Sequence, residues 1–131
     1  MLLVISHAGR GLIEVSSGER VARDYEVPTV SSSWIDDQEM SVEGIGPAQN
    51  QWFSVVGLWG GELKPSNHDH WSVHSKSSGN QDVPYIRHAQ SGAKWLVDTP
   101  VTEIRAFGFS PSGRILVLAT SSEVSAYVSV A

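Results

Sequence analysis

The strong helix formers Ala, Leu, Glu, Lys and Gln never cluster in this 131-residue chain over two or three helical turns. Valine and serine dominate the composition instead, and valine and the aromatic residues fit the half-buried surface of a pleated sheet. Short apolar segments alternate with turns that contain glycine, serine or proline. This pattern predicts an all-β fold of antiparallel β-meanders, with eight to ten strands and little helix.

Segment 51–58 is the strongest expected strand. It is apolar on both faces, which predicts a strand in the middle of a sheet with Trp52 in the core. Trp95 is interpreted as a core residue in the same way. Two polar segments, 30–39 and 76–82, are expected to form long loops, where functional residues are often found. The residues that we expect to be mostly buried are Trp52, Val55, Phe107, Phe109, Leu116 and Leu118.

The composition is that of a folded protein, with 40% hydrophobic and 18% charged residues. The length predicts a single all-β domain over residues 1–131. The chain has no cysteine, which excludes disulfides, cysteine-based metal sites and thiol nucleophiles. A formal net charge of -5 argues against nucleic acid or an anionic membrane as the partner. Because no long apolar stretch or basic leader is visible, we expect a cytoplasmic protein.

Segment 109–120 reads Phe-Ser-Pro-Ser-Gly-Arg-Ile-Leu-Val-Leu-Ala-Thr and resembles a blade of a WD40-like β-propeller. Segment 2–24 is similar to the later part of another blade, with Ser-Gly-Glu at a turn. The resemblance implies propeller-like hairpins at both termini, with a positive φ at Gly113. At roughly 40–45 residues per blade the chain is too short for a closed propeller, so we expect a small β-domain.

Several histidines gather in one polar segment, where His68, Asp69, His70 and His74 lie close together in the sequence. On a strand, His70 and His74 would point to one face, and such imidazoles can bind zinc with a carboxylate as a further ligand. We prefer the alternative of solvated histidines, because no convergent additional ligand is visible. The motifs of serine hydrolases and of nucleotide-binding loops do not occur either. We therefore expect no enzymatic activity, no cofactor and no metal.

Two of the five tryptophans stand beside carboxylates in or near expected loops. Aromatic side chains beside charged groups are typical of protein-binding surfaces, and an indole next to carboxylates would also suit a sugar. The alternative interpretation is that each indole anchors its own loop to the core. The candidate partner-binding residues are Trp34, Asp36, Asp37, Glu39, Trp59 and Glu62.

These features predict a small, acidic, non-enzymatic binding protein. In these general features the chain is similar to bacterial immunity proteins, which are inhibitory partners of toxic effectors. That resemblance implies that acidic loops steer the chain onto the basic active-site cleft of a toxin or effector domain and occlude it. One alternative is a carbohydrate-binding, lectin-like module that completes a β-propeller by oligomerising. The other alternative is a small hydrolase that uses the histidines of segment 68–74.

Overall fold

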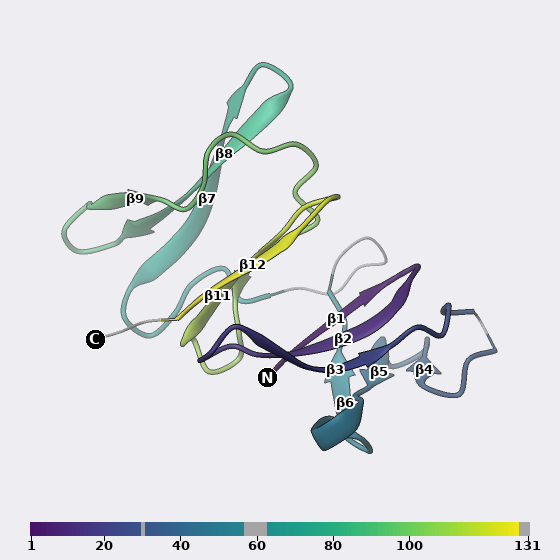
Figure 1. The fold of residues 1–131 in the computed structure, drawn as a ribbon. Coiled ribbons are helices and arrows are strands. Elements are labelled where there is room, and N and C mark those ends of the chain that lie inside the picture. The colour runs from purple at the N-terminus through teal and green to yellow at the C-terminus, as the bar shows by residue number, and fades with distance from the viewer. Residues whose placement is uncertain (30, 57–62, 129–131) are drawn as a thin grey trace. The chain divides into compact units, whose positions relative to one another are not determined.

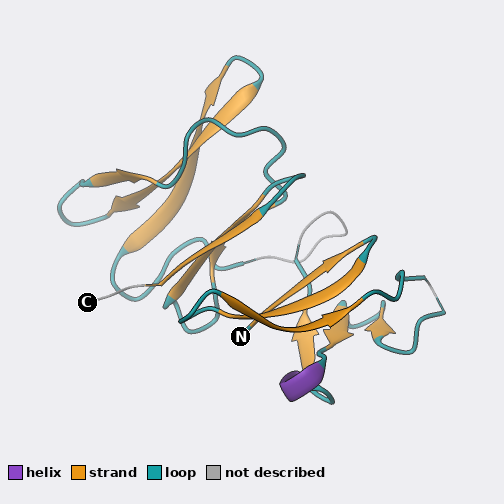
Figure 2. Ribbon diagram, in the orientation of Figure 1, coloured by secondary structure: helices purple, strands orange, loops and turns teal. Residues whose placement is uncertain are grey.

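The computed structural model describes residues 1–29, 31–56 and 63–128. These residues form twelve β-strands in four antiparallel three-stranded sheets, together with one short 3₁₀ helix (Figures 1 and 2). The prediction of an all-β fold of antiparallel meanders with little helix is therefore confirmed, although the strands outnumber the expected eight to ten. The Cα positions divide the chain into two compact units, Met1–Val55 and Val56–Ala131. The single domain stays a prediction.

The first unit contains two of the sheets. One sheet is formed by β1 (Leu2–Ser6), β2 (Gly9–Glu14) and β3 (Glu19–Asp24) in the order β1-β2-β3. The other is formed by β4 (Ile35–Asp36), β5 (Ser41–Glu43) and β6 (Trp52–Ser54), with the 3₁₀ helix η1 (Gly46–Ala48) between β5 and β6. The buried apolar side chains of this unit are Leu12, Trp34, Val42 and Ala48.

Strand β6 corrects the interpretation of segment 51–58. Only Trp52–Ser54 form a strand, and β6 lies at the edge of the β4-β5-β6 sheet rather than in its middle (Figure 1). The side chain of Trp52 is 50% exposed, so its prediction as a core residue is wrong. An apolar sequence on both faces of a strand shows neither whether the strand is central in its sheet nor whether both of its faces are covered. Residues 57 and 58 lie outside the described residues.

A buried arginine joins the two sheets of the first unit. Arg10, on β2, is only 7% exposed. On β3, Oδ2 of Asp24 accepts the Nε–H of Arg10 at 3.1 Å and forms an ion pair with its Nη2. On β5, the carbonyl of Glu43 accepts the Nη1–H of Arg10 at 2.7 Å. The guanidinium carbon lies 4.1 Å from the ring centroid of Trp34. A planar guanidinium has enough donors and π-surface to hold all three partners at once.

The second unit also contains two sheets. One is formed by β7 (Trp71–Ser78), β8 (Gln81–His88) and β9 (Lys94–Leu96), and the other by β10 (Ala106–Phe109), β11 (Ile115–Ala119) and β12 (Val124–Val128). Both sheets contribute to one apolar cluster around the buried residues Ile86, Phe109 and Leu116. Burial of Phe109, Leu116 and Leu118 is confirmed, whereas Val55 and Phe107 are half-buried. Trp95 is 65% exposed, so its core assignment is wrong.

The expected polar loop 76–82 is instead the tip of a long hairpin. Strand β7 continues to Ser78, β8 begins at Gln81, and Gly79 and Asn80 form the turn between them. Gly79 has a φ of +67°. Tight hairpin turns need such positive φ values, and glycine adopts them without steric cost. The strand residues before the turn are polar because both of their faces are exposed, so their pattern resembles that of a loop.

The terminal meanders have the connectivity that the propeller resemblance implied, since β1-β2-β3 and β10-β11-β12 are both three-stranded. Gly113 has a φ of +75°, as expected from its place in the turn after Phe109. The backbone of Lys64 pairs with that of Phe109 through two hydrogen bonds and extends the β10-β11-β12 sheet by one isolated bridge. Membership of the WD40-like family stays a prediction.

The ion pair of Arg10 generates a prediction about pH. The Arg10 hydrogen bonds, followed by the backbone N–H of Glu26, hold the pKa of Asp24 below its ordinary value. A carboxylate of this kind stabilises the folded state above its unfolded pKa of about 4, and the stabilisation is lost as the pH falls through the lower folded-state pKa. We expect Asp24→Asn to lower the free energy of unfolding at neutral pH by about 3 kcal/mol, because Arg10 stays buried without a counter-charge.

Urea denaturation at neutral pH and at about pH 3 measures this effect. The loss of stability on acidification should be smaller in Asp24→Asn than in the wild type. Asp37→Asn is a matched control, because Asp37 is exposed and its removal should change the free energy of unfolding by less than about 0.5 kcal/mol. Identical acid sensitivity of Asp24→Asn and the wild type would show that this ion pair does not contribute to it.

The turn at Gly113 generates a second prediction. A Cβ at this position would lie 3.0 Å from Nδ1 of His68 and 3.2 Å from Cβ of Asn67, whereas a Cβ at Gly79 would have nothing within 4 Å. Both Gly113→Val and Gly79→Val introduce backbone strain of about 1–2 kcal/mol, since both glycines have positive φ. Gly113→Val adds steric crowding, so thermal unfolding should show the larger loss there. A neutral Gly113→Val would contradict the turn geometry.

Candidate functional site

The negative charge of the chain is concentrated in the first unit. Residues 1–55 contain three arginines, no lysine and eight Asp or Glu residues, which accounts for the whole net charge of -5. Residues 56–131 contain six basic and six acidic residues and are formally neutral. No Lys, Arg or His occurs between Arg23 and Lys64. The carboxylates of the β4-β5-β6 sheet therefore have no basic neighbour in their own part of the sequence.

The register of this sheet places acidic and aromatic side chains on one face. Asp36 on β4 is opposite Ser41 on β5, and Glu43 on β5 is opposite Trp52 on β6. Opposite residues share a face, as do residues two apart along a strand. Asp36, Glu43 and Trp52 therefore lie on the same face. The other face carries Ile35, Val42 and Phe53, of which Val42 is only 2% exposed. Trp34, whose carbonyl accepts the N–H of Glu43, lies two residues before Asp36 and is buried under Arg10, so the face of the carboxylates is only partly open to solvent.

Two further carboxylates, those of Asp37 and Glu39, are exposed in the turn between β4 and β5. Oδ1 of Asp36 fixes this turn by accepting the backbone N–H of Gln38 at 3.1 Å and that of Glu39 at 3.0 Å. Oε2 of Glu43 accepts the backbone N–H of Asn50 at 3.0 Å. The acidic groups are thus attached to ordered backbone. We refer to Asp36, Asp37, Glu39, Glu43 and Trp52 together as the acidic face.

The structure separates the predicted site residues into three groups. Asp36, Asp37 and Glu39 come together on the acidic face. Trp34 is 3% exposed beneath the guanidinium of Arg10, which favours the interpretation that its indole anchors the loop. Direct binding of a partner by Trp34 stays a prediction. The remaining candidates, Trp59 and Glu62, lie outside the described residues.

Glu43 and Trp52 belong to this face although neither was singled out for it from the sequence. The alternation of Ser41, Val42 and Glu43 contains a signal for Glu43, because it places the serine and the carboxylate on the face opposite the valine. Trp52 carries a weaker signal, because it shares a strand face with Ser54 while the following Val55 and Val56 continue an apolar run. It is exposed because it projects from the face of β6 opposite to that of Phe53 and Val42.

The histidines do not form a common site. His70 has a φ of +67° and precedes β7, so the expectation that it shares a strand face with His74 is wrong. The ring of His70 is edge-on to that of His88 with 6.2 Å between centroids, while the ring of His74 stacks on Tyr85 at 5.3 Å. Within residues 1–29, 31–56 and 63–128, no three His, Asp or Glu side chains converge as metal ligands would.

Two serine–histidine contacts occur in the second unit. Oγ of Ser72 lies 2.8 Å from Nε2 of His74, and Oγ of Ser91 lies 3.2 Å from Nδ1 of His88. A nucleophilic serine also requires a third group that orients the imidazole. Among the hydrogen bonds of the described residues, no carboxylate accepts from either ring. These contacts therefore lack the arrangement of a hydrolase triad.

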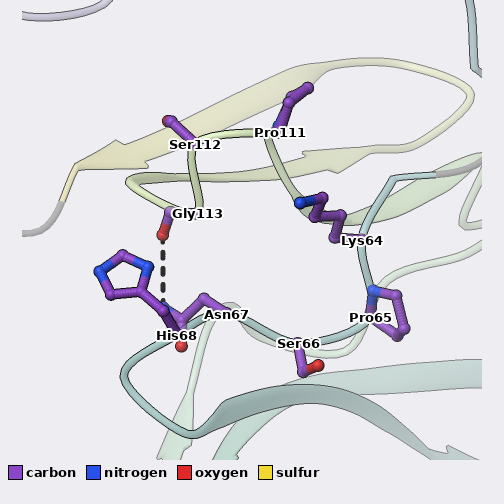
Figure 3. A pocket seen from close by; sticks show the side chains of 8 residues that line it. All are labelled: Lys64, Pro65, Ser66, Asn67, His68, Pro111, Ser112 and Gly113. Atoms are coloured by element: carbon purple, nitrogen blue, oxygen red, sulfur yellow. Dashed lines mark hydrogen bonds between the residues drawn. The ribbon is translucent and has the colours of Figure 1, made fainter.

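A cleft of about 490 Å³ lies between segment 64–68 and the turn 111–113 of the second unit (Figure 3). The side-chain amide of Asn67 donates to the carbonyl of Gly113 at 3.3 Å and joins the two walls. Lys64 and His68 are the titratable residues of its lining, which contains no carboxylate. The cleft presents polar and apolar groups in similar measure, and among the described residues no hydroxyl of its lining forms a hydrogen bond with the imidazole of His68.

Comparison of the chain with protein-family models, with curated protein sequences and with solved structures gives no match. Among the described residues, no helix has the length and apolar character to span a membrane.

The contrast between Trp34 and Trp52 generates a prediction. Trp34→Ala removes a buried indole and should cost about 3–5 kcal/mol of unfolding free energy. Trp52→Ala should cost only about 1–2 kcal/mol, because half of its side chain is already in water. Urea denaturation of both variants measures the difference. Trp34→Phe keeps an aromatic ring beside Arg10 and should recover part of the loss. An equal or larger cost at Trp52 would contradict its exposed position.

Proposed function

We propose that this chain is a non-enzymatic binding protein whose acidic face recognises a basic partner protein. The observation that carries the proposal is the joint presentation of four carboxylates and a half-exposed indole on one ordered sheet face and its adjoining turn. Clustered carboxylates accelerate the approach of a basic surface over long range. A partly exposed tryptophan can then become buried in the interface and slow dissociation.

The proposal extends to the class of partner. A toxin or effector that acts on a polyanionic substrate needs a basic cleft, and an acidic face competes for that cleft by the same electrostatic attraction. The chain would then act as a bacterial immunity protein, in the cytoplasm, by occluding the active site of its cognate toxin. Trp34 supports this function indirectly, because it packs under Arg10 beside the acidic face. Trp59 and Glu62 remain predicted members of the surface.

A lectin-like module that oligomerises is the second candidate function. The observation in its favour is the exposure of two indoles, those of Trp52 and Trp95, either of which can stack on a pyranose ring. Binding of glycans on an array, lost in Trp52→Ala or Trp95→Ala, would favour the lectin. Inhibition of a captured toxin would favour the immunity protein.

The test of the main proposal begins with capture of partners from bacterial lysate on the immobilised chain, followed by kinetics with the purified partner. Asp37→Asn combined with Glu39→Gln should slow association about tenfold at low salt, because exposed charges act mainly on encounter. Trp52→Ala should act mainly on dissociation and weaken binding by about 2 kcal/mol. Binding should also weaken between about 20 mM and about 200 mM salt.

A matched control changes the same number of charges elsewhere. Asp69→Asn combined with Glu123→Gln removes two exposed carboxylates from the second unit and should leave both rates close to those of the wild type. Wild-type kinetics in the Asp37, Glu39 and Trp52 variants would exclude the acidic face as the interface. A partner whose activity is unchanged in the complex would exclude inhibition as the function.

A further inference from the structure

We infer that the partner docks on the acidic face by adding an extended, basic segment to the open edge of β6, as a fourth strand of the β4-β5-β6 sheet. This inference rests on the proposed function and specifies how the partner is bound. It follows from the direction of the backbone groups of β6, from the side chains beside them and from their charge.

The hydrogen bonds between β5 and β6 show which backbone groups of β6 are directed away from the sheet. The N–H of Gly44 donates to the carbonyl of Gln51 at 2.8 Å, and the N–H of Val55 donates to the carbonyl of Met40 at 2.8 Å. In an antiparallel ladder, alternate residues direct both their N–H and their C=O to the same neighbour. Phe53, Val55 and the C=O of Gln51 therefore face β5, the N–H of Gln51 donating to the carbonyl of Ala48 instead. Trp52 and Ser54 direct their N–H and C=O groups to the outer edge.

This outer edge is open within the part of the chain that the structure describes. Strand β6 is the last strand in the order β4-β5-β6 (Figure 1), and the backbones of Trp52 and Ser54 have no hydrogen-bond partner among the described residues. Two residues with outward N–H and C=O groups can form up to four hydrogen bonds with an added strand. Main-chain pairing of this kind provides affinity, and the neighbouring side chains provide selectivity.

The side chains next to this edge select a basic strand. A residue opposite Trp52 or Ser54 on an added strand would lie on the same sheet face as Trp52, Glu43 and Asp36. A Lys or Arg at that position can place its cation over the indole of Trp52 and pair with the carboxylate of Glu43. Because side chains on one face recur every second residue, the fitting partner is an extended segment with basic residues at alternate positions.

Strand addition at β6 is tested by measuring the binding of a short peptide of alternating lysine and valine. A glutamate–valine peptide of equal length is the control. The wild-type chain should bind the lysine peptide and leave the glutamate peptide unbound. Ser54→Pro removes one outward N–H that takes no part in the β5 ladder, and proline is tolerated at such edge positions. We expect Ser54→Pro to weaken binding at least about tenfold. Ser54→Ala keeps the N–H and should bind as the wild type does.

A second measurement uses only the wild-type chain, so it does not depend on whether Ser54→Pro folds. The lysine peptide is N-methylated on alternate residues, which blocks one set of its own hydrogen-bond donors without changing its charge. We expect the added strand to run antiparallel to β6, so that the lysines lie opposite Trp52 and Ser54 and direct their own N–H groups to them. Methylation on the lysines should therefore abolish binding to the wild-type chain. Methylation on the valines, whose N–H groups would point away from β6, should have little effect.

The outcomes separate the docking mode from the proposed function. Equal binding of both methylated peptides, or no binding of the lysine peptide to the wild type, would overturn strand addition. The proposed function would still hold if a captured partner depended on Asp37, Glu39 and Trp52 in the kinetic test. Equal binding of the lysine and glutamate peptides would overturn the basic selectivity itself.

Discussion

The first unit depends on how a buried guanidinium is satisfied. Arg10 leaves water almost completely, and this is costly unless its charge and donors are met. Asp24 provides the counter-charge from β3, the carbonyl of Glu43 accepts from β5, and the ring of Trp34 covers the guanidinium. Because these partners come from both sheets and from the loop between them, the arginine connects the two sheets of the unit. The sheet that carries the acidic face is consequently linked to the β1-β2-β3 sheet through this residue.

Much of the fold could be predicted from the sequence, since hairpins with apolar strands and glycine turns have strong local signals. The terminal meanders and the turn at Gly113 are of this kind. Segment 76–82 predicts a loop because its residues are polar on both faces, so no apolar periodicity distinguishes its strands from a loop. Segment 51–58 was assigned to the middle of a sheet because the place of a strand within its sheet depends on pairing with distant residues, which a local pattern does not contain.

The site was only partly predictable for a related reason. Three carboxylates were identified from their local clustering, and they do lie together. The indole beside them was assigned to Trp34, whereas the exposed indole is that of Trp52. Polar residues surround Trp34 and predict exposure, whereas the apolar residues after Trp52 predict burial. The structure reverses this order because Arg10, which is distant in the chain, packs on Trp34. Exposure of an aromatic residue is a tertiary property, while clustering of charge is a property of the sequence.

The same carboxylates that attract a basic strand also protect the open edge. An unpaired edge strand is a template for pairing with any extended chain, including another copy of itself, and natural proteins limit this risk with short edges and nearby charges. Strand β6 has only three residues, and a second β6 paired with it would bring Glu43 and Asp36 of both copies onto one continuous sheet. Although two β6 strands would separate these carboxylates, their mutual long-range repulsion opposes that pairing at low salt. Repulsion of acidic or identical strands and attraction of basic ones are therefore two consequences of a single arrangement of charge.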